Sequence, residues 1–388
     1  MSQTKVEAPF VANNNVRFKN LVINGDMRIF QRATSATTST STYDTVDRFL
    51  LYESSDGAMT SEKEDLSVAD QATTGQRTAL EMNVTTADGT IAANQFAAIY
   101  HRIEAQNLQH LLYGTSAAKN LTLSFYVKSN KTGTYCISFN KNDSTEYFIP
   151  IEYTISSADT WEKKVIVLSP TAGSTSVITA SGGAIADDNG VGLQITFGLA
   201  WGSNYHGTNN TWTTSSHLAT SNQVNWLDST SNNFYLTGVQ LEVGDQATDF
   251  EHLPFDVQFQ RCQRYFETNY DYEGGYYPVS DVNYDNVAGT HQMTVYIADQ
   301  ARAMVPFKVK KRDISTCAFY RLDGLGDGST AGRWDFYDGG EGNWQQIDGS
   351  QTVGEVSEYG LDINFIDTAL EKQESFIVYG GWSASAEL

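Results

Sequence analysis

Apolar and polar residues alternate along three long stretches, and this period of two constrains the fold more than any other feature of the sequence. The stretches cover residues 120–128, 192–200 and 233–243. Because successive side chains of a β-strand point to opposite faces of a sheet, each stretch is predicted to be a strand with one buried face. Clusters of Gly, Asn and Ser at 129–133 and 186–190 predict turns. Strands separated by turns indicate a β-sandwich or a β-barrel.

The alternation in 233–243 changes phase at Gly238. Phe234 and Leu236 take even positions before the glycine, whereas Val239 and Leu241 take odd positions after it. An extra residue in one strand of an antiparallel pair produces such a shift. We therefore predict a β-bulge at Gly238.

Two short stretches have helical spacing. Residues 105–113 predict a short amphipathic helix that ends at Gly114. A second helix is predicted within 254–269, because Pro254 suits a first helical turn and apolar residues recur there at helical intervals. These apolar residues are Phe255, Phe259, Cys262 and Phe266.

The length of the chain favours more than one domain. It has 388 residues, and a domain typically takes roughly 150. Strand patterns return beyond residue 270, so we expect the second helix to separate two β-rich domains. The expected parts are an N-terminal arm at 1–19, a first domain at 20–253, a linker helix at 254–269 and a second domain at 270–388.

The charge balance argues against two classes of partner. The chain has 46 Asp and Glu against 25 Lys and Arg, a formal net charge of −21. Nucleic-acid binding requires Lys and Arg to replace the counterions of the phosphates, so we expect no nucleic-acid partner. We expect no membrane insertion, since no apolar run reaches the ~18 residues of a membrane span. The N-terminus lacks the apolar core of a signal peptide, so we expect a cytosolic protein or one released by lysis.

No catalytic or metal-binding pattern stands out. Cys136, Cys262 and Cys317 are odd in number and widely separated, and the histidines lack metal-ligand spacing. Glycosidases need two carboxylates at a set separation, and no pair is distinguishable in such an acidic background. We therefore predict a protein without enzymatic activity or a cofactor. Asp/Gly turns at 187–190 and 323–328 leave calcium binding open, with solvated turns as the alternative.

Several long motifs follow one another in the order of a known family. The first is Asn20-Leu-Val-Ile-Asn-Gly-Asp-Met-Arg-Ile-Phe-Gln-Arg32, and the strongest is Thr237-Gly-Val-Gln-Leu-Glu-Val-Gly244. Others lie at 43–49, 102–104, 121–128, 250–254, 262–266, 305–309 and 381–388. The chain resembles tailed-bacteriophage virion proteins labelled tail fibre or structural protein. The resemblance implies an all-β fold, with a jelly-roll β-sandwich akin to carbohydrate-binding modules, a short helix and a second, smaller β-sandwich domain.

The resemblance also implies a place in the virion. The first hypothesis is a short tail-fibre or adhesin subunit that contacts host-surface glycans without catalysis. The second is an architectural head-decoration, head-fibre or tail-collar protein, and a remote third is a capsule-degrading glycosidase. Expected partners are other virion proteins, a host-surface polysaccharide and further copies of the chain in a homotrimer, since similar fibres are mostly trimeric. The position on the virion and the identity of the glycan stay open.

The loop at 203–233 is the candidate glycan-binding region. It has no clear strand pattern, and connections of this length are often functional. Tyr205, Trp212 and Trp226 would offer flat faces to a sugar ring, and His217 would offer a hydrogen-bond partner. The alternative is that the two tryptophans are buried beneath the loop.

The N-terminal arm is the candidate virion-docking segment. Phe10, Val11 and Val16 are its sparse apolar anchors. Segments of this kind often become ordered only on binding. The alternative is a disordered tail without a partner.

Overall fold

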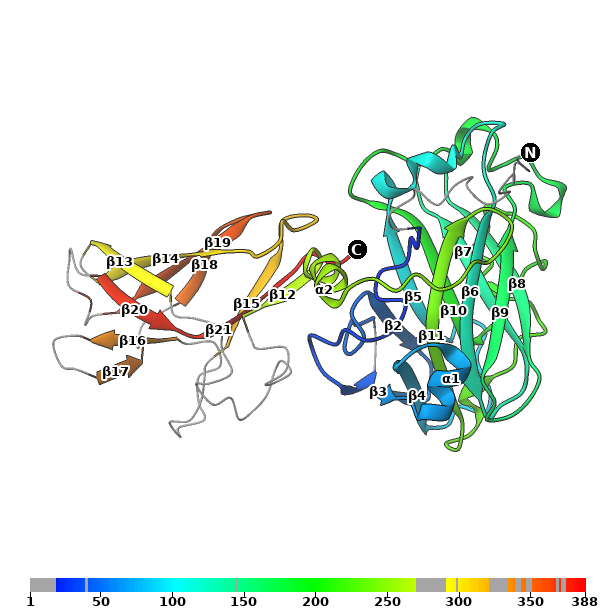
Figure 1. The fold of residues 1–388 in the computed structure, drawn as a ribbon, viewed down its shortest axis with the longest axis horizontal. Helices are drawn as coiled ribbons and strands as arrows, with labels where there is room; N and C mark the ends of the chain where they lie inside the picture. The colour runs from blue at the N-terminus through cyan, green and yellow to red at the C-terminus, as the bar shows by residue number, and fades with distance from the viewer. Residues whose placement is uncertain are drawn as a thin grey trace, which may run out of the picture.

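The computed structural model describes residues 19–38, 41–143, 145–269, 291–297, 299–320, 334–338, 343–346, 351–367, 370 and 375–388. The predicted docking residues Phe10, Val11 and Val16, and the Asp/Gly turn at 323–328, lie outside these ranges. Figure 1 shows a large β-sandwich and a smaller β-rich part, with the helix α2 (Phe255–Gln263) between them. The fold is all-β, as the sequence predicts.

The sandwich consists of two antiparallel sheets. Its strands are β1 (Ser35–Thr38), β2 (Phe49–Ser54), β3 (Ala58–Asp65), β4 (Thr78–Thr86), β5 (Phe96–Glu104), β6 (Leu121–Ser129), β7 (Gly133–Lys141), β8 (Tyr147–Ile155), β9 (Glu162–Leu168), β10 (Val191–Trp201) and β11 (Asn233–Val243). The six-stranded sheet has the order β1-β3-β4-β11-β6-β9, and the five-stranded sheet has the order β2-β5-β10-β7-β8. The strands β4 to β11 therefore follow the strand order of a jelly roll.

The apolar faces of the two sheets meet in the core of the sandwich. On β6, the predicted inward residues Leu121, Leu123, Phe125 and Val127 are all buried. The bulge in β11 is confirmed, because its register against β6 shifts between Thr237 and Gln240. Gly238 has φ +61°, a conformation that glycine adopts at little cost.

The predicted helix at 105–113 is shorter and tighter than expected. It is the 3₁₀ helix η1 (Ala105–Leu111), and its buried residues Ala105, Leu108 and Leu111 recur every third position. Leu112, which adopts φ +55° and is exposed, ends the helix before Gly114 does. The other 3₁₀ turns are η2 (Ala172–Ser174), η3 (Ser181–Gly183), η4 (Ser203–Tyr205) and η5 (Trp226–Asp228).

The linker helix also differs from the prediction at its C-terminal end. The helix α2 stops at Gln263, and Phe266 begins the strand β12 (Phe266–Thr268). Phe266 pairs there with Ser385 of β21 (Gly381–Ser385). The stripe that includes Phe266 is therefore not one helical face, because strand pairing takes over the last residues. Among the described helices, which include α1 (Val68–Thr74), none is long and apolar enough to cross a membrane.

The smaller part contains two sheets that share a core. Its remaining strands are β13 (His291–Ile297), β14 (Gln300–Pro306), β15 (Thr316–Tyr320), β16 (Asp335–Asp338), β17 (Asn343–Gln346), β18 (Gln351–Ser357), β19 (Gly360–Ile366) and β20 (Ser375–Tyr379). Within the described ranges, one sheet has the order β12-β21-β15 and the other β17-β16-β20-β13-β14-β19-β18. Only Gly380 separates β20 from β21, so a single stretch of chain serves both sheets. Trp334 packs against this glycine, and a Cβ there would overlap the indole ring.

Candidate functional site

Two of the four predicted glycan-binding residues are buried. Trp212 is 2 % exposed, and its Nε1 donates to the Ser169 carbonyl at 2.8 Å. Trp226 is fully buried, and its Nε1 donates to the Asn233 carbonyl at 3.0 Å. Both indoles belong to the core of the sandwich, so neither presents a ring to a ligand. The prediction of sugar contact is wrong for these two residues, and the burial alternative is right.

The other two predicted residues are partly exposed but lie in different surroundings. Tyr205, in η4, packs against Trp201 and Phe96 with ring centroids 4.9 and 5.6 Å apart. Its hydroxyl donates to the Asn94 carbonyl at 3.3 Å. The ring of His217 lies against Gly207 within the same loop. Only Tyr205 therefore joins a larger group of side chains.

That group is an aromatic cluster on the outer face of the five-stranded sheet. Its members are Tyr52 of β2, Phe96 and Tyr100 of β5, Trp201 at the end of β10, and Tyr205. Phe96 and Trp201 pair across the strands and stack with centroids 5.2 Å apart. Tyr52 meets Phe96 at 4.8 Å and Tyr100 at 5.8 Å, both edge to face. Tyr52 and Tyr205 are partly exposed at the margin of the cluster, whereas the other three rings are buried.

Polar side chains form a row beside the aromatic cluster. Arg102, Gln194 and Asn140 lie opposite one another on β5, β10 and β7. The Nε of Arg102 donates to the Gln194 Oε1 at 2.9 Å. Next to them, Thr196 lies opposite Ser138 and accepts from Gln194 at 3.2 Å. We call these five residues the polar row.

Some polar atoms on this face are buried without a hydrogen-bond partner among the described residues. They are Ser138 Oγ, Asn140 Oδ1 and Trp201 Nε1. Buried polar groups are usually paired, because an unpaired one costs about 1–3 kcal/mol. Because these atoms have no contact with solvent, the partly exposed Arg102 is the member of the polar row that a ligand on this face meets.

The 203–233 loop covers one side of the same face. Thr213 forms a β-bridge with Phe148 of β8, and Thr220 and Asn222 both donate to Glu152. The loop thereby packs over β7 and β8, and Tyr52 lies on β2 at the other edge of the sheet. Burial raises the pKa of Tyr100 and of Tyr205, so both phenols stay neutral at physiological pH and can donate hydrogen bonds.

Sequence analysis located Tyr205 but missed the rest of the cluster. A signal was present in Phe96-Ala-Ala-Ile-Tyr100, which is apolar at both even and odd positions. A strand with apolar residues on both faces is covered on both sides. Alternation alone does not identify such a strand.

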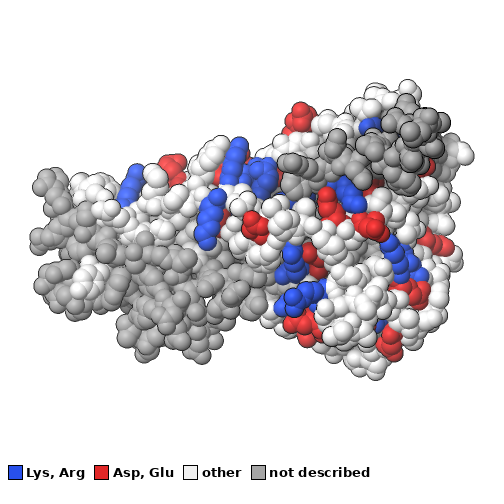
Figure 2. Space-filling view, in the orientation of Figure 1, with Lys and Arg blue, Asp and Glu red and all other residues white. Residues whose placement is uncertain are grey.

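Among the described residues, the charged side chains give no sign of a second site on the face shown in Figure 2. On the face shown in Figure 2, Lys and Arg lie next to Asp and Glu and form no extended patch of one sign. Within the described ranges, no three His, Cys, Asp or Glu side chains gather closely enough to hold a metal ion. In the turn at 187–190, Asp188 accepts from the Gly190 N–H at 2.8 Å, and Asn189 donates to the Arg312 carbonyl at 2.7 Å.

Solved structures with a similar architecture include sugar-binding domains. A candidate sugar-binding protein from Bacteroides thetaiotaomicron is 14 % identical with a TM-score of 0.31, over 58 % of this chain and 99 % of that one. The family 11 carbohydrate-binding module of a Clostridium thermocellum cellulase is 11 % identical with a TM-score of 0.27, over 56 % and 98 %. The enzymatically active domain of tailspike protein 4 from bacteriophage CBA120 is 12 % identical with a TM-score of 0.26, over 58 % and 22 %.

Comparisons at the sequence level give no relative. No family model matches the chain. No curated protein matches it either. The resemblance to phage virion proteins therefore stays a prediction.

Proposed function

We propose that this chain is a non-enzymatic subunit of a phage virion whose sandwich binds a host-surface glycan at the aromatic cluster. One observation carries the proposal: the outer face of the five-stranded sheet combines the partly exposed rings of Tyr52 and Tyr205 with the partly exposed guanidinium of Arg102. Ligand sites typically combine an apolar, aromatic lining with a few polar groups that fix orientation. Tyr52 and Tyr205 stack on the sugar ring, and the guanidinium of Arg102 donates hydrogen bonds to the sugar hydroxyls.

The charge of the chain favours a neutral glycan over a polyanionic one. The formal net charge is −21, which repels a polymer of acidic sugars. On the outer face, Glu152 of β8 lies opposite Cys136, whereas Arg102 is the cation of the polar row. A neutral polysaccharide of the bacterial surface fits this balance.

The experiment compares tyrosines on opposite faces of the sandwich. Tyr52→Ala and Tyr205→Ala should each weaken binding of purified host polysaccharide by about tenfold or more, in line with ~1.4 kcal/mol per decade of affinity. Tyr235→Ala is the matched control, because Tyr235 is also partly exposed but packs against Trp161 on the six-stranded sheet. Titration calorimetry measures the affinities. Equal affinity in the wild type and the three variants contradicts the proposal.

An architectural role is the second candidate, and the smaller part of the molecule favours it. One face of its larger sheet exposes apolar side chains, with Met304 72 % exposed, Ile366 46 % and Tyr296 43 %. Exposed apolar side chains that gather on one face can mark a protein–protein contact. Immunogold labelling of intact virions distinguishes the candidates, since a fibre tip indicates the adhesin and a head or collar position indicates the architectural protein.

A further inference from the structure

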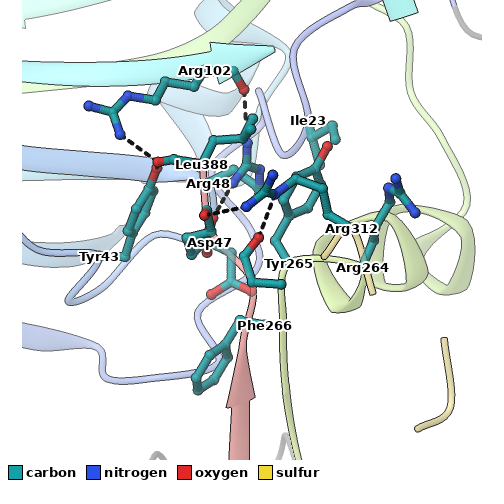
Figure 3. A network of polar contacts seen from close by, with 12 residues as sticks. Ile23, Tyr43, Asp47, Arg48, Arg102, Arg264, Tyr265, Phe266, Arg312 and Leu388 are labelled. Atoms are coloured by element: carbon teal, nitrogen blue, oxygen red, sulfur yellow. Dashed lines mark hydrogen bonds and ion pairs between the residues drawn. The ribbon is translucent and has the colours of Figure 1, made fainter. Parts of the chain in front are cut away.

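Arginine side chains bind residues 386–388, the segment that runs from the smaller part to the sandwich (Figure 3). Arg312 donates from Nε to the Ala386 carbonyl at 2.8 Å and from Nη2 to the Glu387 carbonyl at 3.0 Å. The Nη1 of the same residue donates to the Asn189 carbonyl of the sandwich at 2.9 Å. One guanidinium thus ties the segment to a sandwich loop.

The side chain of Glu387 lies between two arginines of the sandwich. Its carboxylate pairs with Arg32 at 3.0 Å and with Arg48, which is fully buried. The guanidinium of Arg48 also stacks 3.5 Å above the ring centroid of Tyr265 and donates to the Arg102 carbonyl at 2.8 Å. Without Glu387, Arg48 would be a buried charge without its carboxylate.

The backbone oxygen of Leu388 reaches the edge of the glycan-binding face. It accepts hydrogen bonds from Arg102 Nη1 and from the Tyr43 hydroxyl, the latter at 3.2 Å. Arg102 belongs to the polar row, and Tyr43 packs against the hydrophobic cluster that contains the aromatic rings. The guanidinium of Arg102 is therefore held between Leu388 on one side and Gln194 on the other.

We propose that the 386–388 segment is a built-in ligand of the sandwich that positions Arg102 and Tyr43 for glycan binding. The inference rests on the proposed function, and it adds that docking of the smaller part and binding of the glycan are coupled. A long side chain such as arginine loses considerable rotamer freedom when it is ordered. The segment orders Arg102 before the glycan arrives, so the glycan binds more tightly. Coupling is reciprocal, and the bound glycan must therefore hold the segment in place.

The test uses the full chain and two ways of releasing the segment. Arg312→Ala removes the hydrogen bonds to the carbonyls of Ala386 and Glu387. Glu387→Gln removes the charge that pairs with Arg48. Glu358→Gln is the control, because Glu358 pairs with Lys310 at 2.7 Å in a partly exposed ion pair of the smaller part. We expect about a tenfold loss of affinity for host polysaccharide in the first two variants, within the usual 5–150-fold range of coupling, and none in the control.

Hydrogen exchange provides the second readout. The Ala386 N–H donates to the Tyr265 carbonyl at 2.7 Å, so its exchange rate reports docking of the segment. A glycan concentration that just saturates the wild type should slow this exchange in the wild type and slow it less in Tyr205→Ala. Suppose that the Ala386 N–H exchanges faster in Arg312→Ala and Glu387→Gln, but that both variants bind the glycan as tightly as the wild type. The coupling is then wrong and the proposed function stands. If the wild type binds no host polysaccharide, both are wrong.

Discussion

At the scale of single residues, the 203–233 loop shows what composition can and cannot predict. The loop is rich in Asn, Ser, Thr and aromatic residues, which suits sugar contact. Trp212 and Trp226 are nevertheless core residues, whereas Tyr205 is partly exposed. A loop has no regular period, so its sequence does not reveal which side chains point inward. Only the three-dimensional path of the chain separates them.

Replacement of Trp212 by Ala should destabilise the sandwich. Removal of a buried large aromatic side chain leaves a cavity and typically costs about 3–5 kcal/mol. Differential scanning calorimetry should show a fall of several degrees in the unfolding midpoint. Tyr205→Ala, at a partly exposed position, should change the midpoint much less. Equal midpoints for the two variants would contradict the burial of Trp212.

A second prediction concerns the buried ion pair between Lys311 and Glu267. Both side chains are fully buried, and Lys311 Nζ also donates to the Gln263 carbonyl at 2.6 Å. Lys311→Met leaves the Glu267 carboxylate buried without its cation, so the free energy of unfolding should fall by about 3–5 kcal/mol. Urea denaturation measures the change. Lys310→Met, in the neighbouring exposed pair, should have no measurable effect.

Replacing both members of the buried pair tests why Lys311→Met loses stability. Lys311→Met with Glu267→Leu removes both buried charges and should recover part of the stability, because no unpaired charge remains. A double variant less stable than Lys311→Met alone would show that the loss comes from packing.

At the scale of secondary-structure elements, local sequence patterns predict structure well where it does not depend on pairing with a distant segment. The change in alternation at Gly238 is enough to predict a bulge, because the whole signal lies within the sequence of one strand. The end of α2 is different. Phe266 continues a helical stripe by spacing, but the strand β21, far along the chain, supplies backbone partners that turn it into strand. Long-range pairing of this kind leaves no trace in the local sequence.

The contact between β5 and the end of α2 should depend on pH. Burial raises the pKa of Glu104, but hydrogen bonds from Arg264 at 2.8 and 2.9 Å and from Tyr265 outweigh it and hold the pKa below 4.5. A depressed carboxyl pKa stabilises the fold above the unfolded value and loses this effect as the pH falls through the folded value.

Glu104→Gln tests this sign. The variant should be less stable than the wild type at pH 7, and the difference should shrink as the pH falls below the ordinary value of 4.5. Urea denaturation at pH 7, 4.5 and 3 measures both proteins. A difference that is the same at all three pH values contradicts the role of the charged carboxylate.

At the scale of the whole molecule, the described body begins with residues tied to the sandwich. The backbone N–H groups of Lys19 and Asn20 donate to the carboxylate of Glu251 at 3.1 and 2.9 Å. Lys19, which sequence analysis assigns to the arm, is thus anchored. The junction around Glu387 was not predictable either, since it joins residues that are hundreds of positions apart.

These anchors define where the arm can be removed. A chain without residues 2–18 keeps Lys19, Asn20 and their bonds to Glu251, so its unfolding midpoint should equal that of the full chain. If Phe10, Val11 and Val16 dock the protein on the virion, the shortened protein should stay soluble and folded but fail to join particles. Complementation of a phage that lacks the full-length protein, followed by immunoblotting of purified particles, measures incorporation.

The triple variant Phe10→Ser, Val11→Ser and Val16→Ser should behave in the same way, because it removes the apolar contacts without shortening the chain. Normal incorporation of either protein would show that the docking surface lies in the folded body.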